Sequence, residues 1–172
     1  MNNKGFSFLE VMVVVSIIGI MSVIMIPSYK KSMNNKALLL GNKLIMSDIR
    51  MVQGYSYSVQ EFGGVFPEGG YGIHFVSGLN SYIIFADLSP ANKTYDGLAE
   101  KVKEVSLTKN VKVNSTTINA IVIDPIDIIF QPPYGGIFIN TVKNTDQIMK
   151  VEIINGEGNT SIITINGAGA ID

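Results

Sequence analysis

The residues of this chain with the clearest chemistry lie at its N-terminus. A polar leader, residues 1–5, precedes a predominantly apolar run from Phe6 to Ile26 in which Glu10 is the one charged side chain. An ionised carboxylate is costly in lipid, so an acid in such a run indicates a functional role. A cut after Gly5 would place a new amine on Phe6, one helical turn from the Glu10 carboxylate. That amine and carboxylate attract strongly in an apolar bundle, and close pairing between neighbouring helices would set their axial register.

The apolar run predicts a helix that spans a membrane. Phe6 to Ile26 is about the 20 apolar residues that a helix needs to cross the bilayer core. A signal peptide has a shorter apolar core and is cleaved after it. Here the predicted cleavage site, after Gly5, lies before the apolar run. The apolar helix would therefore remain at the N-terminus of the cleaved protein. Pro27 follows the run, and a proline inside a helix permits a local kink or unwinding.

These N-terminal residues resemble the start of type IV pilins and of type II secretion pseudopilins, over roughly the first 35 residues. The resemblance implies that a prepilin peptidase cleaves after Gly5 and methylates the amine of Phe6. Glu10 is then the fifth residue of the mature chain and guides docking in a filament. Pro27 stands where the family often carries a helix-perturbing proline.

The resemblance also implies where the protein works. The helix would lie in the cytoplasmic (inner) membrane as a single span, with the C-terminal domain outside the cytoplasm, until the chain joins a filament of the cell envelope or surface. Its partners would be the prepilin peptidase, other pilins or pseudopilins, and the inner-membrane assembly platform. Such a subunit is structural, with no enzyme activity and no cofactor.

Loose motifs in the second half of the chain are similar to those of H-type minor pseudopilins and related minor pilins. This similarity favours a minor pseudopilin of a type II secretion system, with a major or minor type IV pilus subunit as the alternative. A membrane-anchored binding module that never polymerises is an alternative of another class. The segments that carry the similarity are 66–73, 82–87, 129–133 and 163–167.

Periodicity predicts an α+β fold, with one long helix packed on an antiparallel β domain. The helix continues beyond the membrane, with Gly54 as its predicted stop, because apolar residues recur at helical spacing. These residues are Leu38, Leu39, Ile45, Met46, Ile49 and Val52. The predicted division is a leader at 1–5, a helix at 6–56 of which 6–26 span the membrane, and a β-rich domain at 57–172.

Short β-rich runs fill the predicted domain. The first two are joined by Ser77-Gly-Leu-Asn80, which indicates a hairpin. A turn is predicted at Pro132-Pro133-Tyr134-Gly135. The predicted strands are 71–76, 81–87, 102–107, 119–124, 127–131, 136–140, 149–154 and 161–165.

Charge is distributed unevenly between the two halves. Residues 1–50 carry six basic and two acidic side chains, a net charge of +4, and residues 51–172 carry seven basic and twelve acidic, a net charge of −5. A nucleic-acid-binding domain would show a basic patch. The acidic domain with scattered lysines therefore predicts no nucleic-acid partner.

The sequence offers little for catalysis. The chain has no cysteine, which excludes a disulfide and a Cys-based metal site. His74 is the single histidine and lies in a predicted strand, where a packed or surface role is the simpler interpretation. Asp124 and Asp127 flank Pro125 like an acid pair, but a solvated turn explains them better.

One loop carries a weak candidate for calcium. Asp87, Asn92 and Asp96 offer oxygen ligands of the kind that calcium prefers. Lys93 opposes a cation there, and Asp and Asn are also ordinary turn formers. The sequence therefore predicts no metal site, with calcium in this loop as the idea to check.

Overall fold

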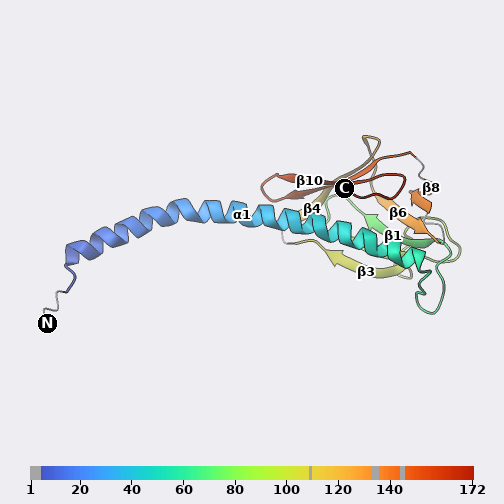
Figure 1. The fold of residues 1–172 in the computed structure, drawn as a ribbon, viewed down its shortest axis with the longest axis horizontal. Helices are drawn as coiled ribbons and strands as arrows, with labels where there is room; N and C mark the ends of the chain where they lie inside the picture. The colour runs from blue at the N-terminus through green and yellow to red at the C-terminus, as the bar shows by residue number, and fades with distance from the viewer. Residues whose placement is uncertain (1–4, 109, 133–135, 144–145) are drawn as a thin grey trace.

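The computed structural model describes residues 5–108, 110–132, 136–143 and 146–172. Leader residues 1–4 and positions 133–135 of the predicted proline-rich turn lie outside this part of the chain. The fold is a long N-terminal helix packed against antiparallel β-sheets (Figure 1), which confirms the predicted α+β class.

The helix α1 (Phe8–Tyr57) begins at Ser7, whose side chain accepts a hydrogen bond from the Glu10 backbone N–H, as an N-cap residue does. It continues through Pro27, which lacks an N–H for the helical ladder, and Figure 1 shows a gently curved helix at its N-terminal half with no break. The helix passes the predicted stop at Gly54 and ends one residue beyond the predicted domain bound at 56. Ser58 donates its N–H to the Gly54 carbonyl, so α1 extends to Tyr57 before it is capped.

Two antiparallel sheets make up the β domain. Within the described residues, the six-stranded sheet has the order β3-β2-β1-β6-β7-β8 and the four-stranded sheet the order β10-β9-β4-β5. The strands of the first are β1 (Gly70–Phe75), β2 (Ser81–Asp87), β3 (Lys101–Ser106), β6 (Ile126–Gln131), β7 (Gly136–Ile139) and β8 (Val142–Lys143). Those of the second are β4 (Val111–Ile118), β5 (Ile121–Val122), β9 (Met149–Asn155) and β10 (Thr160–Ile165).

Seven of the eight predicted strands are observed within one or two residues of their predicted bounds, and the predicted hairpin is the antiparallel pair β1–β2. The predicted strand at 119–124 is wrong. Asn119 and Ala120 have positive φ and form the turn after β4, so pairing resumes at Ile121 and ends at Val122.

The sequence pattern does not predict strand β4, because the alternation of its inward and outward side chains is interrupted. Val111 and Val113 point inward and Lys112 outward, but a register irregularity between Val113 and Ser115 moves the inward positions to Thr116 and Ile118. A bulge of this kind inserts one residue and breaks the period of two on which strand prediction relies. The two-residue strand β8 was also not predicted.

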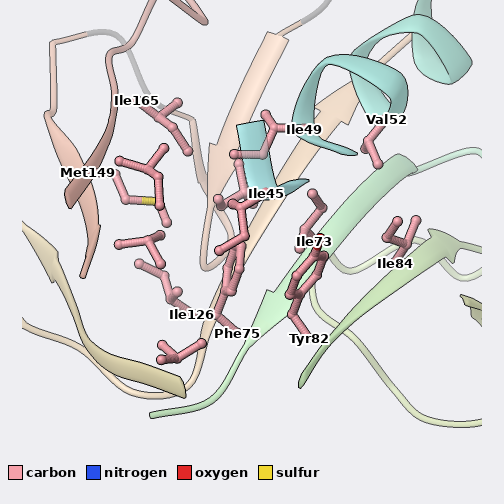
Figure 2. Close-up of a cluster of buried hydrophobic side chains, with 14 of the residues drawn as sticks. Ile45, Ile49, Val52, Ile73, Phe75, Tyr82, Ile84, Ile126, Met149 and Ile165 are labelled. Carbon is pink, nitrogen blue, oxygen red and sulfur yellow. The ribbon is translucent and has the colours of Figure 1, made fainter. Parts of the chain in front are cut away.

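The main core lies between α1 and the two sheets. Ile45, Ile49 and Val52 come from one face of α1 and are fully buried (Figure 2). Figure 2 shows them facing side chains from both sheets, among them Ile73 and Met149. Since burying a large aliphatic side chain contributes about 1.5–3 kcal/mol, this face of α1 holds the two sheets together.

Polar contacts fix the helix on the sheets at defined positions. The Tyr82 hydroxyl of β2 donates to the buried Asp48 carboxylate at 2.7 Å, and burial together with this carboxylate raises the pKa of Tyr82 well above its usual value. Ser56 Oγ accepts the Tyr71 backbone N–H at 3.1 Å. Asn42 Nδ2 donates to Ser161 Oγ at 2.7 Å. These bonds reach β1, β2 and β10, so they set the position of α1 against both sheets.

We expect Tyr82→Phe to lower the free energy of unfolding by about 1–3 kcal/mol, because it leaves the buried Asp48 carboxylate without this donor. The measurement is denaturant unfolding of the full chain in detergent. Tyr57→Phe is the matched control, since Tyr57 is exposed and its hydroxyl makes no hydrogen bond within the described residues. An equal effect of the two substitutions would contradict the role given to the Tyr82–Asp48 bond.

Candidate functional site: the exposed N-terminal helix and the β2–β3 loop

The first half of α1 projects away from the β domain (Figure 1). From Phe6 to Met33 every described side chain is exposed, although the segment is predominantly apolar. The helix is long and apolar enough to cross a membrane, by its length and composition. Ser16 and Ser22 donate their hydroxyls to Met12 and Ile18 carbonyls, so these polar groups are satisfied inside the helix. From Phe6 to Ile26 the segment thus presents predominantly apolar surface to its surroundings.

Three of the predicted processing and assembly residues lie together at the tip of this segment. Gly5 precedes the helix, and a side chain there would meet nothing within 4 Å, so the chain is open around the predicted cut. Phe6 and Glu10 line one shallow depression of about 320 Å³ with Val11, Val14 and Val15. An apolar wall beside a carboxylate is suited to a neighbouring helix whose end carries a positive charge.

Glu10 makes no side-chain hydrogen bond or ion pair within the part of the chain that the structure describes. It is the acidic residue of the first helical turn, where a negative charge also interacts favourably with the helix dipole. Its carboxylate is exposed and surrounded by apolar side chains. A carboxylate that costs free energy to bury and has no partner among the described residues is available to a partner from another molecule.

Pro27 lies about one membrane thickness from Phe6 along α1, since the 21 intervening steps rise about 1.5 Å each. Lys30 and Lys31 follow it and are exposed. The proline thus marks the change from an apolar to a polar surface. Local opening of the helix there stays a prediction.

Comparison with known proteins identifies the N-terminal segment. Residues 1–26 match the family model described as the prokaryotic N-terminal methylation motif. This chain carries that prepilin-type motif. The match is consistent with the pilin and pseudopilin family and extends over the leader and the apolar half of α1. No curated protein and no solved structure matches the chain.

The predicted residues of the β domain lie elsewhere, around the loop between β2 and β3, residues 88–100. This β2–β3 loop covers the face of the six-stranded sheet opposite α1. Its Tyr95 ring lies 5.4 Å from the Phe85 ring and 5.1 Å from the His74 ring. The loop is therefore packed on the sheet by aromatic contacts.

Three acids accept hydrogen bonds from the backbone of the β2–β3 loop. Asp87 accepts from the N–H groups of residues 92 and 93, Glu100 from those of residues 88 and 96, and Asp127 from that of Tyr95. All three acids are buried. Buried polar groups must be hydrogen-bonded, so these carboxylates and the loop N–H groups satisfy one another.

His74 and Asp127 form a close pair. His74 Nδ1 lies 2.7 Å from Asp127 Oδ1, because the two residues are cross-strand neighbours in β1 and β6. The prediction of a solvated turn is therefore wrong for Asp127, which lies inside a strand and is buried. Asp124 does lie in an exposed turn, where it accepts the Ser77 backbone N–H at 2.8 Å. The His74–Asp127 pair anchors the β2–β3 loop to the sheet.

The candidate calcium ligands are occupied within the chain. Lys93 Nζ lies 3.7 Å from Asp87 Oδ2 and donates to the Gly69 carbonyl at 2.8 Å. Asn92 Nδ2 donates to Asp96 Oδ2 at 2.7 Å. Across the described residues, no three His, Asp or Glu side chains gather as metal ligands would. This geometry favours the turn interpretation of the loop, with Lys93 as its cation.

Burial has opposite effects on the pKa values of these groups. Desolvation raises the pKa of the Asp87 carboxyl, although Lys93 and two backbone N–H groups oppose the change, and desolvation also raises the pKa of Glu100. Desolvation lowers the pKa of Lys93. Burial thus favours the neutral forms of Asp87, Glu100 and Lys93, whereas the backbone N–H groups that bond to the two acids favour their charged forms.

This geometry predicts a pH dependence of stability. Because the folded pKa of Glu100 lies above its unfolded value of about 4.3, its contribution is complete below that pH and is lost as pH rises through the folded pKa. When the pH falls from 7 to 5, we expect the unfolding free energy of the wild-type chain to increase. We expect a smaller increase in Glu100→Gln, with both proteins measured as full chains in detergent.

Glu104→Gln is the control, because the Lys101 ammonium and the Ser81 hydroxyl lower the pKa of this exposed acid, so it stays ionised at both pH values. Comparing the unfolding free energy at the two pH values within each variant removes any loss of stability that the substitution causes equally at both. An identical pH response of wild type and Glu100→Gln would contradict the assignment.

Proposed function

We propose that this chain is a structural subunit of a filament of the type IV pilus or type II secretion kind. The observation that carries the proposal is that α1 is buried against the β domain over its second half and exposed and apolar over its first, where the N-terminal methylation motif lies. An apolar helix satisfies its own backbone either in lipid or in a bundle of helices. It can therefore pass from the membrane into a filament core.

In this proposal the prepilin peptidase cleaves after Gly5 and methylates the Phe6 amine. The chain waits in the inner membrane with its β domain outside the cytoplasm, and an assembly platform then moves it into the filament. The carboxylate of Glu10 pairs with the Phe6 amine of a neighbouring subunit. Since both groups are desolvated in the core, only a close pair is favourable, and the pairing selects one axial register.

The proposal takes two forms, a rare subunit and a repeating one. The motifs of the β domain favour a minor pseudopilin, which is a rare subunit, and the alternative is a major or minor type IV pilus subunit, of which the major one repeats along the filament. The ratio of this chain to the other subunits in isolated filaments distinguishes a rare subunit from a repeating one.

The first prediction concerns processing. We expect the N-terminal peptide from native membranes that contain the peptidase to begin at a methylated Phe6, and Gly5→Glu to retain the leader. Mass spectrometry of that peptide is the measurement. Gly19→Ala is the control, because it changes another glycine without adding a charge to the apolar run. We expect this variant to be processed normally. A wild-type chain that retains residues 1–5 would overturn the proposal.

The second prediction concerns assembly. We expect Glu10→Leu to insert into the membrane and be cleaved normally, but to be lost from filaments, because the carboxylate partner of the Phe6 amine is gone. Ser16→Leu is the matched control in the same apolar segment, since the Ser16 hydroxyl bonds only its own helix. The measurement is the amount of each variant in isolated filaments relative to membranes. Normal incorporation of Glu10→Leu into filaments would overturn the register role of Glu10, whereas absence of the wild-type chain from filaments would favour an anchored binding module.

A further inference from the structure

The outward face of the second half of α1 carries a line of cations. Lys36, Lys43 and Arg50 are exposed and follow one another at intervals of seven residues. At 100° per residue, a heptad step returns to nearly the same side of a helix. These three residues, here called the basic stripe, therefore lie on the face of α1 opposite Ile45 and Val52, which are buried in the core. At 1.5 Å per residue the stripe is about 21 Å long.

The basic stripe has no acidic counterpart in its own helix. Asp48 is the single acid between residues 30 and 57, and it is buried against Tyr82. None of the three cations makes an ion pair or a side-chain hydrogen bond within the described residues. Exposed Leu39 and Leu40 flank the stripe, so it combines positive charge with apolar surface.

The loop that follows α1 has the complementary character. Residues 58–69, here called the acidic loop, contain Glu61 and Glu68 and no basic residue. Both acids are exposed and make no side-chain bond within the described part of the chain. Phe66 and Val65 are also exposed, and Val65 pairs with Phe62 across a tight turn that shapes the loop tip.

Most other exposed acids in the described part of the domain already have partners. Glu104 is paired with Lys101, Asp96 with Asn92, and Glu157 with Asn34. The acidic loop is distinguished by two unpaired carboxylates beside exposed apolar side chains in one short segment. It therefore matches both the charge and the apolar flanks of the basic stripe.

We propose that the basic stripe docks the acidic loop of a second copy of this chain. Glu61 and Glu68 of one copy face Lys36 and Lys43 of the other, and Val65 and Phe66 pack against Leu39 and Leu40. The inference rests on the proposed function and selects, from its two forms, the repeating subunit.

The positions of the two surfaces determine how the copies are arranged. The acidic loop begins after Tyr57, whereas the docking part of the stripe is residues 36–43, so docked copies are displaced by about 21–32 Å along the helix axis. The two surfaces are different patches of the chain, so the contact is head to tail. A contact of this kind that does not close into a ring produces an open filament.

The displacement also agrees with the predicted contact of Glu10. Pairing Glu10 with the Phe6 amine of a neighbour displaces two helices by four residues, about 6 Å. The docking contact spans several such steps. It therefore joins copies that are not adjacent in the helical series, and both contacts can be present in one filament.

Lipid headgroups are a poorer match for the basic stripe. Lys36 lies ten residues beyond Ile26 and Arg50 lies 24, which places them about 15 and 36 Å past the end of the apolar run. The headgroup region extends roughly 5–8 Å from the hydrocarbon core on each side. Lys30 and Lys31 lie at the depth of the lipid headgroups, whereas the basic stripe lies beyond the headgroup region.

The absence of cysteine from the chain permits a direct test by cross-linking. Two differently tagged full-length copies are expressed together in native cells, one with Leu40→Cys and the other with Val65→Cys. We expect a disulfide-linked mixed dimer. Leu98→Cys, at an exposed apolar position outside the acidic loop, replaces Val65→Cys as the matched control and is expected to give no dimer with Leu40→Cys.

Charge reversal tests whether the contact supports assembly. We expect Lys36→Glu with Lys43→Glu, or Glu61→Lys with Glu68→Lys, to lower the amount of the chain in filaments by about tenfold, since repulsion is repeated along the filament. Combining both pairs in one chain should restore most of it. Lys112→Glu with Lys150→Glu, both exposed on the four-stranded sheet, is the control and is expected to have little effect.

The outcomes separate this inference from the proposed function. Processed Phe6 and normal filaments from both reversed pairs, without a mixed cross-link, would overturn the docking contact and leave the filament role intact. Loss of assembly that the combined variant does not restore, with cross-linking of Leu40→Cys to another filament protein, would assign the stripe to a different partner. Reduced binding of the stripe variant to phosphatidylglycerol vesicles without the cross-link would assign it to lipid. An unprocessed Phe6 would overturn the proposed function itself.

Discussion

The packing of the second half of α1 on both sheets is the interaction on which the rest of the structure depends. α1 contacts β1 and β6 of one sheet and β4, β9 and β10 of the other. Ile45, Ile49 and Val52 fill the space between the sheets, and the Asp48–Tyr82 bond fixes the helix at one position. Without cysteine no disulfide can strengthen this arrangement. The two sheets are joined through the helix and its core, and through backbone hydrogen bonds between the β1–β2 turn and Val113 of β4.

That packing also places two surfaces of different character on one continuous helix. Residues 6–26 are predominantly apolar and exposed, as suits lipid or a bundle of helices, whereas residues 38–56 are apolar on one face only. Because α1 is continuous from Phe8 to Tyr57, a force applied at the N-terminal segment is transmitted directly to the β domain. The basic stripe lies on a side of the second half that the sheets leave exposed.

The opposite face of the six-stranded sheet uses different chemistry. There the β2–β3 loop is held by buried acids that accept hydrogen bonds from its backbone N–H groups and by tilted ring contacts of Tyr95 with His74 and Phe85. Acids that look like ligands in the sequence therefore act as hydrogen-bond acceptors for a loop. The only histidine, His74, contributes through its pair with Asp127.

The sequence by itself determined the features that depend on neighbouring residues. The position of the N-terminal motif, the apolar run, the helical periodicity of Leu38 to Val52 and most strands follow from local patterns, because they reflect side-chain spacing of 3.6 or 2 residues. Only the tertiary structure decided the features that join distant segments. Strand register and long-range packing decide the bulge that interrupts the side-chain alternation of β4 and the division into two sheets. They also decide the burial of Asp127 against His74 and the ion pair between Asp87 and Lys93. Such contacts bring together residues tens of positions apart, and no local pattern specifies them.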